Sequence, residues 1–212
     1  MCETITIPHI DKTVEWQNGD CTVIVGSHGT GKTLLIEAMK SWCDEKEYEY
    51  IHYDAHSAFD DVYELIKNSD DIDIIHSCMI MSTFIKDFED DIRVWALAKG
   101  YKETEEDKYI RDPTLLRAVL RGCGTGYTRM FIFTIKAIQN PSANYYFLDL
   151  PETSLHVMVA RKIITYIMSN FRHLKIVAAT HSPEIMDDVY NINEEYCTAE
   201  EEDSHMIDLG YY

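Results

Sequence analysis

Residues 26–33 read GSHGTGKT, directly after the apolar run TVIV and directly before a helical pattern that begins at Lys32. They match G-x-x-x-x-G-K-[ST] at every fixed position, and a strand–loop–helix of this kind aims backbone N–H groups and a helix N-terminus at an anion. Glycine lets such a loop curl closely around a phosphate. We therefore predict a phosphate loop whose nucleotide-binding residues are Gly26, Ser27, His28, Gly29, Thr30, Gly31, Lys32 and Thr33.

Within this loop, Lys32 is expected to reach the β- and γ-phosphates of a nucleotide, and Thr33 to bind Mg²⁺. The magnesium ion needs an acidic partner, usually at the end of a neighbouring apolar strand. Residues 144–156, NYYFLDLPETSLH, place Asp149 after four apolar or aromatic residues. We predict that Asp149 holds Mg²⁺ directly or through water; an aspartate in a surface turn is the alternative.

The remaining pattern alternates strands with helices, which favours an α/β fold with a mostly parallel sheet. We expect a single P-loop domain over residues 1–212, a three-layer sandwich with an antiparallel β element at the N-terminus. Strands are expected at 4–7, 13–16, 21–25, 72–81, 145–148 and 175–179. Helices are expected at 32–42, 84–98, from 113, over 130–138 and over 155–167, with a short terminal element after 191.

Composition excludes several classes of protein. The 212 residues carry a formal net charge of −18, which disfavours a general nucleic-acid coat protein or a polybasic membrane binder. No apolar run approaches the ~18 residues of a membrane span. The six cysteines are isolated, without a CxxC pair, and the first twelve residues lack the features of a secretory signal. We expect a cytoplasmic protein with free thiols.

The segment 44–107 is strongly acidic, with 19 acidic and 6 basic side chains. We expect residues 44–112 to form an acidic, partly helical insertion or lobe. The charges mark either a solvated face or a docking surface for a basic partner.

Taken in order, the motifs resemble those of the compact ATPase heads of the ABC superfamily, closest to the branch with RecF, Rad50, SMC and OLD-type proteins. That branch commonly has D-E-P-E, two variable residues and L-H after an apolar strand, where this chain has DLPETSLH at 149–156. Residues 177–186, VAATHSPEIM, resemble its switch-histidine strand, with His181 as the switch residue. Residues 122–129, GCGTGYTR, resemble its signature motif and are called the signature-like segment below.

The resemblance implies ATP and Mg²⁺ as ligands and a homodimer gated by nucleotide. Thr125, Gly126 and Arg129 would contact the ATP of the second subunit, and His181 would hydrogen-bond the γ-phosphate. Such a head controls a separate effector protein or a nucleic-acid-processing machine; the net charge does not favour DNA binding. The alternatives are an interhelical turn at the signature-like segment and a core histidine at position 181.

The chain departs from the family pattern where the catalytic glutamate is expected. That position is Leu150, which can neither accept a proton nor orient water. Glu152 is the nearest substitute, so we expect ATP hydrolysis to be slow. The alternative is an ATP-binding sensor or interaction module without hydrolysis; the nucleotide-binding subunit of a transporter is a more distant one.

The family's glutamine, which follows a strand between the phosphate loop and the signature, is also missing. The chain's two glutamines, Gln17 and Gln139, lie elsewhere, and a polar residue such as Ser82 or Thr83 is one candidate replacement. Trp16 either stacks on adenine or packs in the core. No sustained heptads separate the two motifs, so we expect no coiled-coil arm. Too few residues follow position 190 for a Toprim domain, so we expect none.

Overall fold

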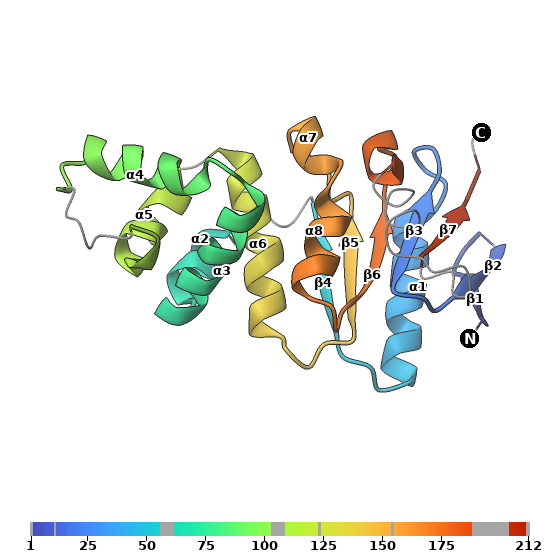
Figure 1. Ribbon diagram of the computed structural model, residues 1–212. Coiled ribbons are helices and arrows are strands. Elements are labelled where there is room, and N and C mark those ends of the chain that lie inside the picture. The colour runs from blue at the N-terminus through green and yellow to red at the C-terminus, as the bar shows by residue number, and fades with distance from the viewer. Residues whose placement is uncertain are drawn as a thin grey trace. The chain divides into compact units, whose positions relative to one another are not determined.

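A computed structural model describes residues 2–10, 12–55, 62–102, 109–122, 124–153, 155–187 and 204–210 (Figure 1). The chain divides into two compact units. Unit 1 lies within residues 1–55 and 142–212, and unit 2 within residues 56–141. The expectation of one domain over residues 1–212 stays a prediction.

Unit 1 contains a five-stranded parallel sheet in the order β4 (Tyr50–Asp54), β5 (Tyr145–Asp149), β6 (Lys175–Ala179), β3 (Cys21–Val25) and β7 (Ser204–Asp208). A separate antiparallel pair is formed by β1 (Cys2–Ile7) and β2 (Lys12–Gln17). These sheets confirm the mixed α/β fold, the mostly parallel sheet and the N-terminal antiparallel element.

Both faces of the parallel sheet are covered, since every residue of β3 and β5 is buried. Helix α1 (Lys32–Glu45) packs against β1, β5 and β6, and α8 (Ile163–Asn170) packs against β6. The α1 face of the sheet shares one core with β1 and β2, which includes Ile7, Trp16, Ile24, Leu35, Met39, Phe147 and Val177. This layered packing supports the C-terminal ends of β3, β5 and β6.

Trp16 belongs to this core. Its side chain is fully buried, its indole N–H donates to Thr22 Oγ1 at 2.9 Å, and its ring meets that of Trp42 edge-to-face at 5.0 Å. Of the two interpretations of this tryptophan, packing is therefore correct and stacking on adenine is not.

Unit 2 is helical in the residues that the structure describes. Its elements are α2 (Val62–Asn68), α3 (Asp71–Phe84), α4 (Phe88–Ala98), the short 3₁₀ helix η1 (Tyr109–Arg111), α5 (Pro113–Gly122) and α6 (Thr125–Gln139). Helix α3 packs against α5 and α6. Arg117 on α5 joins the end of α2 to the start of α3, donating to Ser69 O at 2.5 Å and to Asp71 Oδ1 at 2.6 Å.

Two sequence expectations need correction, and one strand was not expected. The strand expected at 72–81 is the helix α3, which buries Ile74, Ser77, Cys78 and Met81 at helical spacing. A short apolar run does not by itself distinguish a buried strand from a helix. The helix expected over 155–167 is two helices, α7 (Val157–Ala160) and α8, and the strand β4 was not expected.

In the part of the chain that the structure describes, no helix has the length and apolarity needed to cross a membrane.

Candidate nucleotide site

The phosphate loop joins the end of β3 to the start of α1, as the sequence predicts. Gly31 precedes the helix with a φ of 95°, a left-handed conformation that favours glycine. A methyl group added there would lie 2.8 Å from Ile10 Cδ1, and one added at Gly26 would lie 2.6 Å from Thr30 Oγ1. Glycine is therefore favoured at position 31 by its backbone conformation, and at both positions an added methyl group would require a neighbouring side chain to move.

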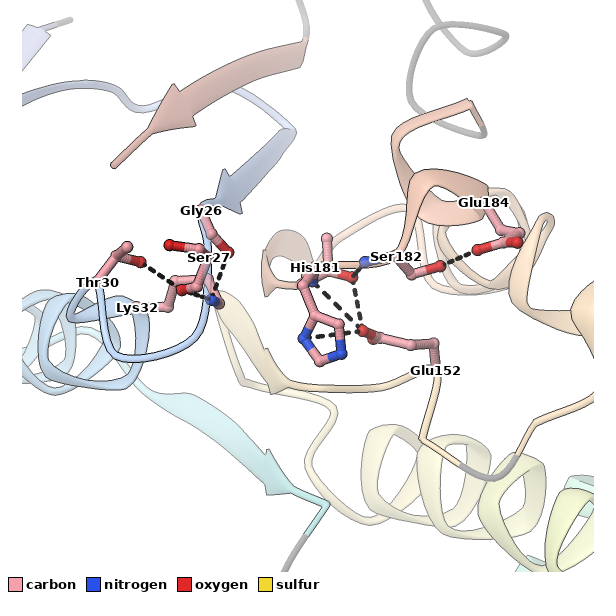
Figure 2. Close-up of polar contacts among 9 residues, drawn as sticks. Gly26, Ser27, Thr30, Lys32, Glu152, His181, Ser182 and Glu184 are labelled. Carbon is pink, nitrogen blue, oxygen red and sulfur yellow. Dashed lines mark hydrogen bonds and ion pairs between the residues drawn. The ribbon is translucent and has the colours of Figure 1, made fainter. Parts of the chain in front are cut away.

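Lys32 folds back over the loop (Figure 2). Its Nζ donates to Gly26 O at 2.7 Å and to Ser27 O at 2.9 Å, and Thr30 Oγ1 donates to Ser27 O at 2.9 Å. Burial lowers the pKa of Lys32, and the charges of Asp149 and Glu152 oppose that shift. The ammonium group of Lys32 thus lies at the phosphate loop, where a positive charge favours binding of phosphate.

Thr33 and Asp149 are in direct contact. Thr33 Oγ1 donates to Asp149 Oδ2 at 2.8 Å, and Asp149 is only 5% exposed at the end of β5. A hydroxyl oxygen and a carboxylate beside a phosphate loop are the ligands that Mg²⁺ prefers, together with water and phosphate oxygens. The residues present therefore fit a magnesium–nucleotide complex.

Asp54 is an acidic residue near this site that the sequence analysis missed. It ends β4 in register with Asp149 on the adjacent strand β5, and Ala55 N donates to Asp149 O at 3.1 Å. Register partners in a parallel sheet point to the same face, and their strands lie about 4.8 Å apart. His52, two residues earlier on this face, approaches Lys40 Nζ of α1 at 3.4 Å. The signal in the sequence was a short alternating strand, YIHYD, that ends in a carboxylate.

Glu152 and His181, the two residues predicted to act on ATP, lie together. Glu152 Oε1 accepts from Thr180 Oγ1 at 2.8 Å and lies 3.9 Å from Nδ1 of the exposed His181 (Figure 2). Between Asp149 and Glu152, Leu150 adopts a φ of 53°, and its N–H donates to Ala179 O at 3.0 Å. The structure thus gathers Glu152 and His181 at the ends of β5 and β6.

The signature-like segment lies in unit 2, at the end of α5 and the start of α6. Thr125 is exposed at the first position of α6 and Gly126 is half-buried, whereas Arg129 is only 2% exposed. Tyr127 Oη donates to Asp91, which ties α6 to α4. The roles of Thr125, Gly126 and Arg129 towards a second nucleotide stay predictions.

The proposed replacements for the missing glutamine, Ser82 and Thr83, do not follow a strand. Both lie in the last turn of α3, where their hydroxyls donate to Met79 O and Ile80 O. The strand assigned to 72–81, which these two residues were expected to follow, is therefore wrong. The strand that does lie between the phosphate loop and the signature-like segment is β4, and it ends at Asp54.

No protein-family model matches the chain, and no curated protein matches it significantly. Among solved structures it is similar to MJ1267, an ATP-binding cassette of an ABC transporter, with 12% identity, a TM-score of 0.46, and coverage of 84% of this chain and 78% of that chain. It is also similar to cbiO1 from Clostridium perfringens, part of the ABC transporter complex cbiONQ, with 12% identity, a TM-score of 0.44, and coverage of 91% and 94%. Likeness at this level does not identify a function, and the assignment to the RecF, Rad50, SMC and OLD-type branch stays a prediction.

Proposed function

We propose that this protein is a Mg-ATP-binding ATPase head of the ABC type. The observation that carries the proposal is the contact of Thr33 Oγ1 with Asp149 Oδ2 at 2.8 Å, directly beside the phosphate loop. This contact brings the hydroxyl and carboxylate ligands of a magnesium ion to the start of α1, where backbone N–H groups favour phosphate. Lys32 supplies the positive charge for the β- and γ-phosphates.

The head acts as a nucleotide-gated homodimer. ATP held by the phosphate loop of one subunit is contacted by Thr125 and Gly126 of the other, so the γ-phosphate joins the subunits. Arg129 joins this contact once its side chain, only 2% exposed in this structure, turns outward. The partner whose activity this gating controls is a separate effector protein in the cytoplasm. The 19 acidic side chains between residues 44 and 107 favour a basic docking surface on that effector and disfavour DNA.

Hydrolysis is slow in this proposal because Leu150 occupies the position of the usual glutamate. Loss of a positioned general base typically costs ~10²–10⁴-fold in rate. The same residue favours the second candidate, an ATP-binding sensor or interaction module that does not hydrolyse its ligand. The two candidates share the site and differ in turnover.

The first test is ATP binding measured by calorimetry in Mg²⁺, with Lys32→Ala and the matched control Lys46→Ala. Lys46 is exposed at the end of the same helix, so its loss should leave affinity unchanged. Loss of Lys32 should weaken binding by about 100-fold or more, because the phosphate loses a partly buried charged partner worth about 3 kcal/mol. Equal affinity of the two variants would contradict the proposal.

The second test is solution mass by light scattering, without nucleotide and with Mg-ATP. Mg-ATP should raise the mass towards that of a dimer for the wild type and Lys46→Ala, but not for Lys32→Ala. A dimer that persists for hours indicates very slow or absent hydrolysis, and one that decays within minutes indicates turnover. A mass that does not respond to Mg-ATP would exclude gating by dimerisation.

A further inference from the structure

Glu152 is held through one of its two carboxylate oxygens. Oε1 accepts from the hydroxyl of Thr180 at 2.8 Å and from the backbone N–H of His181 at 3.5 Å. The other oxygen, Oε2, is buried and has no hydrogen-bond partner among the residues that the structure describes. A buried carboxylate oxygen without a donor is costly, and such an atom commonly accepts from water or a ligand.

Thr180 is a rigid donor for this contact. Its side chain is fully buried directly after β6, and its backbone N–H donates to Ile24 O on β3, the strand that leads into the phosphate loop. Its hydroxyl oxygen also accepts from Ser182 N at 2.9 Å. Because a hydroxyl has a single hydrogen, that hydrogen is committed to Glu152 Oε1.

The turn that follows supports this arrangement. Ser182 Oγ donates to Glu184 Oε2 at 2.5 Å, which fixes the backbone after His181 (Figure 2). In the same view the carboxylate of Glu152 points towards His181. Its charge also acts on Lys32 of the phosphate loop, where it opposes the lowering of the lysine's pKa by burial. The end of β6 that holds Glu152 through Thr180 is paired with β3, the strand that leads into the phosphate loop.

We propose that Thr180 is a positioning residue that holds Glu152 so that Oε2 accepts a hydrogen bond from the water that attacks ATP. The inference deepens the proposed ATPase function and rests on it. It assigns to Glu152, held from the neighbouring strand end, the task that the side chain of Leu150 cannot perform. Thr180 itself does not touch the nucleotide.

Hydrolysis of ATP at this site needs water as its only second reactant. The water oxygen forms a bond to the γ-phosphorus, and the bond from that phosphorus to the β,γ-bridging oxygen breaks. ADP leaves with the bonding electron pair. The proton lost by water passes to Glu152 Oε2 and from there to the phosphate product or to solvent.

The test compares Thr180→Val, Thr180→Ser, Glu152→Gln and the double variant Thr180→Val/Glu152→Gln. ATP affinity is measured by calorimetry, and hydrolysis by single-turnover release of labelled phosphate. Thr180→Val keeps the shape of the side chain but removes the hydroxyl, so hydrolysis should fall by about 10–100-fold with ATP affinity unchanged. Thr180→Ser should restore the rate, and the double variant should be no slower than Glu152→Gln because both changes act on one group.

A Thr180→Val rate equal to that of the wild type, or losses that multiply in the double variant, would overturn the inference. If Thr180→Val does not fold, a wild-type rate in Glu152→Gln overturns it equally. ATP binding by the wild type with no turnover would also overturn it and leave the ATP-binding function intact. Failure of the wild type to bind ATP would instead remove the proposed function.

Discussion

Thr33 and Asp149 are 116 residues apart in sequence, yet Thr33 Oγ1 donates to Asp149 Oδ2 at 2.8 Å. Thr33 lies in the first turn of α1, and Asp149 is the last residue of β5. Strand β6 separates β5 from β3, the strand that precedes the phosphate loop, so the contact crosses a full strand of the sheet. The contact places a hydroxyl and a carboxylate side by side at the C-terminal ends of the parallel strands.

Removing the hydroxyl of Thr33 should uncouple ATP binding from magnesium. Mg²⁺ increases the affinity for ATP, and we expect this increase to be about 10–100-fold smaller in Thr33→Val than in the wild type. Calorimetry across a magnesium titration measures it. Thr33→Ser should retain the increase because it keeps the hydroxyl. Thr83→Val, in the last turn of α3, is the matched control. The same magnesium dependence in Thr33→Val and the wild type would count against a metal ligand at this position.

Asp54 should contribute to the same cation site because it lies in register with Asp149 at the end of β4. We expect Asp54→Asn to weaken binding of Mn²⁺ in the presence of a non-hydrolysable ATP analogue by about 10-fold, a loss typical of residues just outside the ligand shell. Electron paramagnetic resonance of free Mn²⁺ measures this directly. Asp20→Asn removes an exposed carboxylate elsewhere in unit 1 and should have no effect. Identical Mn²⁺ affinity in both variants would exclude Asp54 from the site.

Gly31→Ala should destabilise unit 1. The backbone at Gly31 has a φ of 95°, which costs an L-residue about 1–2 kcal/mol, and the new methyl group would approach Ile10. Gly29→Ala separates the two effects, because its φ is 82° but nothing lies within 4 Å of an added methyl group. Urea unfolding should show a loss for both, larger for Gly31→Ala. Unchanged stability of both variants would show that the loop conformation differs from this one.

Gly126→Ala should raise the free energy of unfolding but weaken the Mg-ATP-dependent dimer. Alanine in the first turn of α6 meets nothing within 4 Å and should raise the free energy of unfolding by up to about 1 kcal/mol. The same methyl group would obstruct the proposed approach of this backbone to the ATP of a second subunit. Light scattering should then show a weaker Mg-ATP-dependent dimer despite the greater stability. An unaltered dimer would argue for a plain interhelical turn.

His52 should make the protein less stable in mildly acidic solution. Burial, followed by the charge of Lys40, lowers the pKa of His52 below its ordinary value of 6.5, against smaller opposing effects of nearby carboxylates. Between the lowered folded-state pKa and 6.5 the unfolded chain binds more protons, so stability falls as the pH drops through that window. Urea midpoints should therefore fall less steeply below pH 6.5 for His52→Gln than for the wild type. Equal slopes would show that His52 titrates alike in both states.

The elements that were predicted correctly carry strong local signals. The phosphate-loop glycines and the apolar run TVIV identify β3 and the start of α1, and YYFLD identifies β5 because a strand buried on both faces is continuously apolar. The segment 72–81 was assigned wrongly because its apolar residues fit a strand as well as a helix. Only its packing against α5 and α6 selects the helix.

The sequence by itself determined the order of the motifs and the residue types that a magnesium–nucleotide site requires. These are properties of short segments: a glycine pattern before a helix, an aspartate after one apolar run, and a histidine after a second apolar run. The tertiary structure decided which of these residues meet. Strand order, set by burial of both sheet faces, brings Asp54 into register with Asp149 and brings Thr180 against Glu152. Contacts between strand ends depend on the pairing of distant segments, which no local pattern encodes.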